Sequence, residues 1–302
     1  MLNTMISLLR PIADASRPAV LRVGVGAYSV AQQVRRRKMF RSLHRQDPKR
    51  FKPVGVVSVL KRPLPPRVAD AVLDLSLVTN VLATAGVAHR ITGPANAALQ
   101  WWTLTYRNSW GMIFHHDNMM LLHQSVLGVT RSADSLSVDS LLRDGELLPE
   151  RSGRSYGAVA PAMNVATCAI YLISGVAKVR SPRGWKWASG DTLRDQIAAD
   201  ALRKEVFGST PPETARHLES SGTPFGVLAA VSLAVELGAP AALAHPRLGQ
   251  LFAVGAWGMH WGIRRMMGIK FSYNTSGVAY LSFFPWDLPS SDSHAHLTGS
   301  SS

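Results

Sequence analysis

Four ionisable side chains lie in or beside long apolar runs of this sequence: Lys178, Glu236, His116 and His260. Lys178 directly follows the longest charge-free run. Poor solvation disfavours an ammonium ion, and the neutral amine that results can act as a base. Alternatively, Lys178 extends along the apolar surface to reach water, as lysines at the ends of apolar helices commonly do.

Glu236 lies within an apolar run, between Ala-Val and Leu-Gly-Ala-Pro. An isolated carboxylate in hydrocarbon is costly, so we expect Glu236 to face the protein interior and to have a partner. Two interpretations stay open. The residue is either structural, protonated or ion-paired, or it relays protons or contacts a ligand.

Three histidines and an aspartate stand in FHHDNMMLLH at 114–123, at the start of an apolar run. His116 and His123 would lie about 10 Å apart along a helix, whereas zinc–nitrogen bonds are about 2 Å, so one ion cannot bridge them. Adjacent His115 and His116 point about 100° apart. We therefore predict no metal site. His116 and His260 are candidates for acid–base or hydrogen-bonding work, the alternative being core histidines that bond neighbouring helices.

Apolar runs predict the elements that must hold these side chains. The clearest run is 155–177, which carries no charge, and about 20 such residues cross a bilayer core as a helix. We predict an all-α fold, a polytopic transmembrane bundle of about seven or eight membrane-embedded helices, some of them short. The other candidate runs are 18–34, 75–87, 91–106, 118–130, 222–244, 248–263 and 271–286.

The 302 residues carry a formal net charge of +14, and lysines and arginines gather between positions 35 and 67. By the positive-inside rule this segment is cytoplasmic, and we expect it to contact anionic lipid. Basic clusters also bind nucleic acid, but no recognised motif accompanies this one, so we expect no nucleic-acid partner. We divide the chain into an N-terminal helix and basic loop at 1–66, a transmembrane domain at 67–288 and a disordered tail at 289–302.

The order and spacing of several motifs resemble the HTTM (horizontally transferred transmembrane) family, which includes the vitamin K-dependent gamma-glutamyl carboxylase. The first is His116 followed by SVDSLL at 137–142. The second is YLISGVAK at 171–178 followed by Gly184 and Trp185. The third is a series of short motifs: ELG at 236–238, PRL at 246–248, GMH at 258–260, MGI at 267–269 and FFP at 283–285.

The resemblance implies an integral protein of the cell membrane that acts on a quinol or lipid in a membrane pocket, with a reduced quinone of the vitamin K or menaquinol type as cofactor. Lys178 would be the base, and His116, His260 and Glu236 would position groups or relay protons. Carboxylation of protein glutamates is not expected, because no segment resembles the extramembrane region of the carboxylase. The alternative function is a non-enzymatic membrane scaffold, a partner subunit bound to another membrane protein, or a small transporter.

Overall fold

A computed structural model describes residues 9–111, 115–208, 210 and 224–288. These residues are mainly helical, which confirms the all-α prediction for this part of the chain. The strands found among them are β1 (Ala13–Asp14) and β2 (Ser152–Gly153), which pair antiparallel. The chain divides into two compact units, residues 1–163 with 285–302 and residues 164–284.

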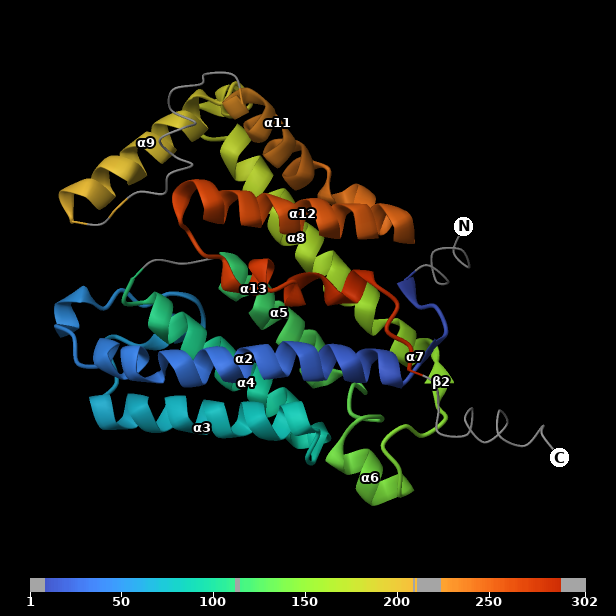
Figure 1. Ribbon diagram of the computed structural model, residues 1–302. Coiled ribbons are helices and arrows are strands. Elements are labelled where there is room, and N and C mark those ends of the chain that lie inside the picture. The colour runs from blue at the N-terminus through green and yellow to red at the C-terminus, as the bar shows by residue number, and fades with distance from the viewer. Residues whose placement is uncertain (1–8, 112–114, 209, 211–223, 289–302) are drawn as a thin grey trace. The chain divides into compact units, whose positions relative to one another are not determined.

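Long helices build the described part of the first unit. Helix α3 packs against both α2 and α4, and α5 packs against α4 and α2; Figure 1 shows α2 and α3 side by side. The long helices are α2 (Ser16–Leu43), α3 (Pro66–Ala85), α4 (His89–Asn108) and α5 (His115–Val129). The short elements are η1 (Pro48–Arg50), η2 (Gly55–Val59), α6 (Val138–Asp144) and α7 (Arg154–Gly157).

The middle turns of helix α3 bury polar side chains and expose several apolar ones. Ser76 and Asn80 are each 0% exposed, whereas Leu75 is 56% and Val78 is 55% exposed. A helix on the surface of a water-soluble protein has the opposite polarity, with its apolar stripe toward the core. An apolar exterior around a hydrogen-bonded polar interior is the arrangement that a lipid environment favours.

Helices α4 and α5 touch through their backbones. A Cβ atom added to Gly93 would lie 2.5 Å from the carbonyl oxygen of Gly128, and one added to Gly128 would lie 2.6 Å from that of Gly93. Neither position has room for a side chain. Small residues that let backbones approach this closely are typical of helix packing in membranes.

The second unit contains most of α8 (Val159–Val179), whose first turns belong to the first unit. Helix α12 packs against α9, α11 and α13 and against η4 and η5. The remaining elements, which Figure 1 shows in yellow to red, are η3 (Gly184–Trp187), α9 (Asp191–Val206), α11 (Pro224–Leu237), η4 (Ala239–Leu243), α12 (Pro246–Met267), α13 (Ser272–Thr275) and η5 (Val278–Phe283).

Two helices of the described chain, Pro66–Ala85 and Arg154–Val179, are long and apolar enough to cross a membrane. They contain nearly all of the predicted runs 75–87 and 155–177. The runs 18–34, 91–106, 118–130 and 248–263 lie mostly within α2, α4, α5 and α12. The run 271–286 is not one helix as predicted, because Gly277 turns the backbone at φ 81° between α13 and η5. The predicted tail at 289–302 lies outside the described residues.

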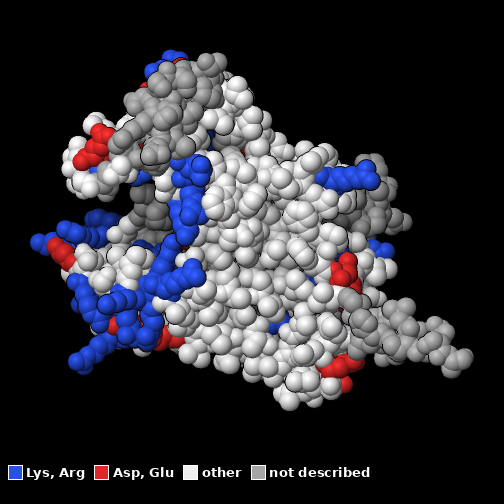
Figure 2. All heavy atoms as spheres, viewed as in Figure 1, with Lys and Arg blue, Asp and Glu red and all other residues white. Residues whose placement is uncertain are grey.

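The basic segment begins inside α2 and is partly neutralised by α3. Asp74 accepts hydrogen bonds from Arg37 and Arg41, and Asp70 pairs with His44 and Arg45. Figure 2 shows the lysines and arginines of this segment as a dense group over the C-terminal end of α2. Part of the basic cluster therefore fastens α2 to α3.

Candidate functional site

Lys178 and Glu236 form an ion pair in the second unit. Lys178 lies in the last turn of α8 and Glu236 near the end of α11, and the ammonium group donates a hydrogen bond to Oε1 of Glu236. The Glu236 side chain is 8% exposed and that of Lys178 is 29% exposed. The lysine also lies over the ring of Trp187, with its nitrogen 5.7 Å from the ring centroid. The partner expected for Glu236 is thus a lysine 58 positions earlier in the chain.

Gly175 allows α8 and α11 to approach each other at this pair. A Cβ atom at Gly175 would lie 2.9 Å from Cβ of Glu236 and 3.0 Å from the side chain of Leu237. Gly175 precedes Lys178 by three residues, so both lie on one face of α8. The GVAK sequence at 175–178 therefore places the lysine against the carboxylate.

The second carboxylate oxygen, Oε2 of Glu236, is buried and has no hydrogen-bond partner among the described residues. A buried acceptor without a partner is costly. Oε2 can therefore accept a proton or one more hydrogen bond, and part of the Lys178 side chain is accessible to solvent.

His260 belongs to a second polar group, formed with Tyr171, Tyr280 and Asn274. Nδ1 of His260 lies 2.8 Å from the carbonyl oxygen of Ala256, which can only accept, so Nδ1 carries a proton. The hydroxyls of Tyr171 and Tyr280 lie 3.3 and 3.4 Å from Nδ1 and 2.6 Å from each other. In the neutral ring the basic nitrogen is then Nε2.

Asn274 holds the two tyrosines together. Its amide nitrogen donates to the hydroxyl of Tyr280 at 2.9 Å and to that of Tyr171 at 3.3 Å. Its own oxygen is buried without a hydrogen-bond partner in the described part of the chain. None of Tyr171, Tyr280 and Asn274 was predicted as a site residue from the sequence. The available signal was the spacing of Tyr171 and Lys178, which are nearly two helical turns apart on one face of α8, about 10 Å along its axis.

His116 lies in the first unit, at the start of α5. It is buried, and its Nε2 is 3.4 Å from Oδ1 of Asp117. The other oxygen of Asp117 accepts a hydrogen bond from Arg107 on α4. The structure thus brings Lys178, Glu236 and His260 into one unit and places His116 in the other. The membrane pocket expected to hold Lys178, Glu236, His260 and His116 together stays a prediction.

Buried amides link the helices of the first unit. The amide nitrogen of Gln33 on α2 donates to Gln100 on α4 at 3.1 Å and to Ser76 on α3 at 3.3 Å. Asn80 of α3 donates to Gln33 at 2.9 Å and accepts from Gln124 of α5 at 3.2 Å. One hydrogen-bonded network therefore spans the four long helices of this unit.

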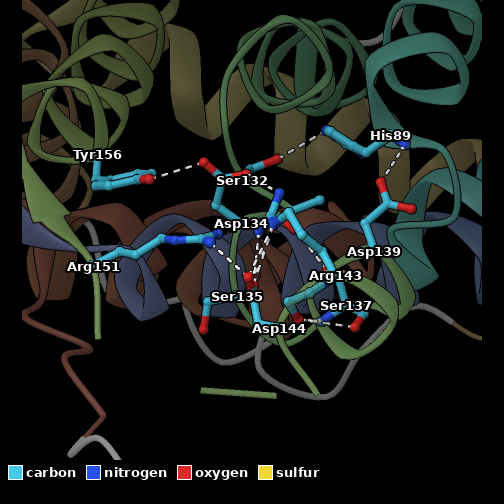
Figure 3. Close-up of polar contacts among 12 residues, drawn as sticks. His89, Ser132, Asp134, Ser135, Ser137, Asp139, Arg143, Asp144, Arg151 and Tyr156 are labelled. Carbon is cyan, nitrogen blue, oxygen red and sulfur yellow. Dashed lines mark hydrogen bonds and ion pairs between the residues drawn. The ribbon is translucent and has the colours of Figure 1, made fainter. Parts of the chain in front are cut away.

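The SVDSLL motif at 137–142, drawn in Figure 3, caps the N-termini of two helices. Asp139 accepts hydrogen bonds from the backbone N–H groups of Ala88 and His89, at 2.7 and 2.8 Å, and so caps the start of α4. Ser137 and Ser140 form a capping box at the start of α6. A carboxylate at a helix N-terminus is favourable because the exposed N–H groups carry partial positive charge.

Charged groups beside this motif complete the cluster in Figure 3. Arg143 and Arg151 both point to Asp144, and Tyr156 donates a hydrogen bond to Asp134 at 2.8 Å. The hydrogen bonds from Arg143, with the positive charges of both arginines, hold the pKa of Asp144 below its usual value, although burial opposes them.

Arg22 of α2 binds backbone oxygens at the end of α3 and in the segment before α6. It is buried, and its guanidinium donates to the carbonyl oxygens of Ser132 at 2.9 Å and Leu136 at 2.6 Å, and also to that of Thr84. The charge that interrupts the apolar run 18–34 is therefore satisfied by backbone oxygens.

No group of three or more histidine, cysteine or acidic side chains that could hold a metal ion occurs in the described ranges. Comparison of the chain with protein-family models, with curated proteins and with solved structures gives no match.

Proposed function

We propose that the chain is a polytopic integral membrane protein of the HTTM type, in the cell membrane, with a proton-transferring site at Lys178 and Glu236 that acts on a quinol or lipid. Two long apolar helices and the apolar exterior of α3 support the membrane environment. Exposed apolar side chains on α8, α11 and α12 add to it: Val165, Ile173, Val227, Val231, Leu251 and Val254.

The observation that carries the proposed chemistry is the ion pair in which the buried Oε2 of Glu236 has no hydrogen-bond partner among the described residues. In a medium of low dielectric the separated charges of Lys178 and Glu236 are poorly stabilised. Moving the shared proton from Nζ to Oε1 leaves a neutral amine beside a neutral acid, and that amine can take a proton from a bound hydroxyl. Glu236 acts as the store for the transferred proton.

The residues fit a ligand that presents an acidic hydroxyl. Oε2 of Glu236 is an acceptor without a partner among the described residues, and Lys178 is partly accessible. A reduced quinone supplies such a hydroxyl, together with reducing electrons. His260, held by Tyr171 and Tyr280, would position a second polar group farther along α8.

The test compares Lys178→Met with Lys186→Met in the full-length protein. Lys186 is an exposed lysine in η3, so the control removes the same charge outside the pair. Both variants should stay with the membranes through a carbonate wash. Incubation with reduced menaquinone and oxygen should form the quinone epoxide with the wild type and with Lys186→Met but not with Lys178→Met. Unchanged turnover in Lys178→Met would remove the assignment.

The second candidate is a non-enzymatic membrane scaffold, partner subunit or small transporter. It is favoured by the fact that Glu236 already neutralises Lys178 and that Tyr171, Tyr280 and Asn274 bond α8 to the last elements of the unit. In that function the polar groups only join helices. Co-purification of a stable protein partner without any epoxide formation would favour it.

A further inference from the structure

An open cleft of about 690 Å³ lies in the first unit, where α4 begins and α5 ends. The residues that follow α5 and the residues of α6 complete its lining. Figure 3 shows four of the lining residues, His89, Asp134, Asp139 and Arg143. Binding sites for small molecules are typically about 300–1,000 Å³, so the cleft has the size of a ligand site.

The cleft lies just beyond the end of the long apolar helix α3. Gly86 and Ala88 have left-handed backbone angles, with φ 69° and 46°, and turn the chain from α3 into α4. The 20 residues of α3 rise about 30 Å, the thickness of the hydrocarbon core of a bilayer. The basic segment pairs with Asp70, near the other end of α3. In a membrane that α3 crosses, the cleft therefore lies at the surface opposite the basic segment.

The charged groups of the cleft leave an excess of positive charge. Three arginines and two aspartates line it: Arg90, Arg131, Arg143, Asp134 and Asp139. Both carboxylates already have partners, because Asp139 caps α4 and Asp134 pairs with Arg143. The excess charge therefore belongs to Arg90 and Arg131.

Arg90 and Arg131 stand on either side of one contact between α4 and the segment after α5. Nε2 of His89 lies 3.1 Å from the hydroxyl oxygen of Ser132, and each arginine is the chain neighbour of one of these two residues. Both arginines are exposed, and neither has an ion pair within the described ranges. The hydrogen-bond partner of Arg131, Tyr156, is neutral. Two guanidinium groups are thus available to an anion, and their planar geometry suits the oxygens of a phosphate.

Apolar side chains line the same cleft beside the arginines. Ile91 of α4, Val129 of α5 and Leu142 of α6 are all exposed. Exposed apolar groups next to basic groups, at the end of a helix that can cross a membrane, are typical of sites for phospholipid head groups. A phosphate ion in water would use the arginines alone and would leave these apolar side chains exposed.

We propose that the cleft binds one phospholipid with a net negative head group, whose phosphate accepts hydrogen bonds from Arg90 and Arg131 and whose acyl chains pack on Ile91 and Val129. The inference rests on the proposed membrane environment and is independent of proton transfer at Lys178. It concerns the membrane surface opposite the one that the basic segment contacts.

The binding assay uses the full-length protein in a neutral detergent and a dioctanoyl phosphatidylglycerol with a diazirine in one acyl chain. After illumination, mass spectrometry of the peptides should find the lipid on residues 88–94 and 128–143. Unlabelled dioctanoyl phosphatidylglycerol should prevent this labelling. Dioctanoylglycerol lacks the phosphate, glycerol 3-phosphate lacks the chains and dioctanoyl phosphatidylcholine has no net charge, so each should compete less well. Equal competition by any of these three would overturn the proposal.

Arginine variants test the phosphate contact. Arg90→Gln and Arg131→Gln should each weaken binding of phosphatidylglycerol at the cleft about tenfold, the effect of losing one charge-assisted hydrogen bond. Arg67→Gln is the matched control, since Arg67 is an exposed arginine at the start of α3 that does not line the cleft. Equal weakening by all three variants would show that only the net charge of the protein matters, against the proposal.

A further pair of variants tests the apolar contact. Ile91→Ser should weaken binding of the lipid, whereas Val78→Ser, on the exposed side of α3, should not. Unchanged affinity in Ile91→Ser would contradict the assignment.

A carbonate wash separates this inference from the membrane assignment. Release of the wild type from membranes by the wash would overturn both. Retention of the wild type without labelling of the cleft would overturn the lipid site alone. Lys178→Met should be labelled normally even if it loses all quinol-dependent activity.

Discussion

Removing one partner of the ion pair between Lys178 and Glu236 should destabilise the fold more than removing one partner of an exposed salt bridge. Exposed pairs contribute about 0 to 1 kcal/mol, and either partner can be removed at little cost. Here the carboxylate is 8% exposed, and the lysine supplies its hydrogen bond. Lys178→Met leaves both oxygens of Glu236 without a partner among the described residues.

Breaking a buried pair by removing one partner costs about 3–5 kcal/mol. We expect about 3 kcal/mol for Lys178→Met, the lower end of that range, because the lysine side chain is 29% exposed. Glu236→Leu should cost about 1 kcal/mol, since the remaining ammonium group can turn toward solvent. The double variant replaces the pair with apolar groups and should lie within about 1 kcal/mol of the wild type.

The assay is reversible unfolding of the full-length protein in mixed detergent micelles, followed by circular dichroism as sodium dodecyl sulfate is added. The coupling free energy from the four proteins should be about 3 to 5 kcal/mol. Additive effects in the double variant would mean that Lys178 and Glu236 do not interact, and the proton-transfer site would lose its basis.

Three other predictions concern the first unit. Asp139→Ala removes the cap of α4 and should lower the free energy of unfolding by about 1 to 2 kcal/mol in the same assay, with Asp139→Asn retaining part of it. Gly93→Ala drives a methyl group against the carbonyl oxygen of Gly128 and should cost about 1 to 3 kcal/mol; a neutral result would mean that α4 and α5 are not in backbone contact. Because Arg143 holds the pKa of folded Asp144 below its unfolded value of about 3.9, its stabilisation is present above pH about 4 and is lost as the pH falls further, so Asp144→Asn should flatten the acid limb of a stability–pH curve.

The composition of the sequence was sufficient to predict the helices that are long and uniformly apolar. The uncharged run at 155–177 lies within the helical span Arg154–Val179, and the run at 75–87 lies mostly within α3. Counting apolar residues failed at 271–286, because the count ignores backbone geometry. Gly277, with φ 81°, ends the helical direction there, and Asn274 is used for tertiary hydrogen bonds.

Lys178 and Glu236 could each be predicted as site residues from the sequence, but the ion pair between them could not. Because burying a carboxylate is costly, Glu236 needed a partner, and Lys178 had the opposite charge. Its position against Glu236 depends on the close packing of α8 and α11 at Gly175, which the sequence does not reveal. Tyr171 and Tyr280 were missed because tyrosines in apolar runs read as core residues. Hydrogen bonds across more than 100 positions leave no local signal in the sequence.

Arg22 illustrates the same limit in the first unit. In the sequence it only weakens an apolar run, whereas in the fold it binds the backbone oxygens at the end of α3 and in the segment before α6. Likewise, SVDSLL at 137–142 contributed to a family resemblance, and its physical role is to cap α4 and α6. The lesson in both cases is that backbone partners cannot be inferred from residue type.

The most direct test of the central claim, that these helices lie in lipid with their polar side chains inside, is the accessibility of spin labels in reconstituted bilayers. With Cys168 replaced by alanine, single cysteines at Val78 and Ile173 report on the exposed apolar faces of α3 and α8, and one at Arg35 reports on the basic segment. Val78 and Ile173 should be reached by oxygen in preference to a water-soluble nickel chelate, and Arg35 should show the reverse. Equal access of the nickel chelate to all three positions would contradict the membrane assignment.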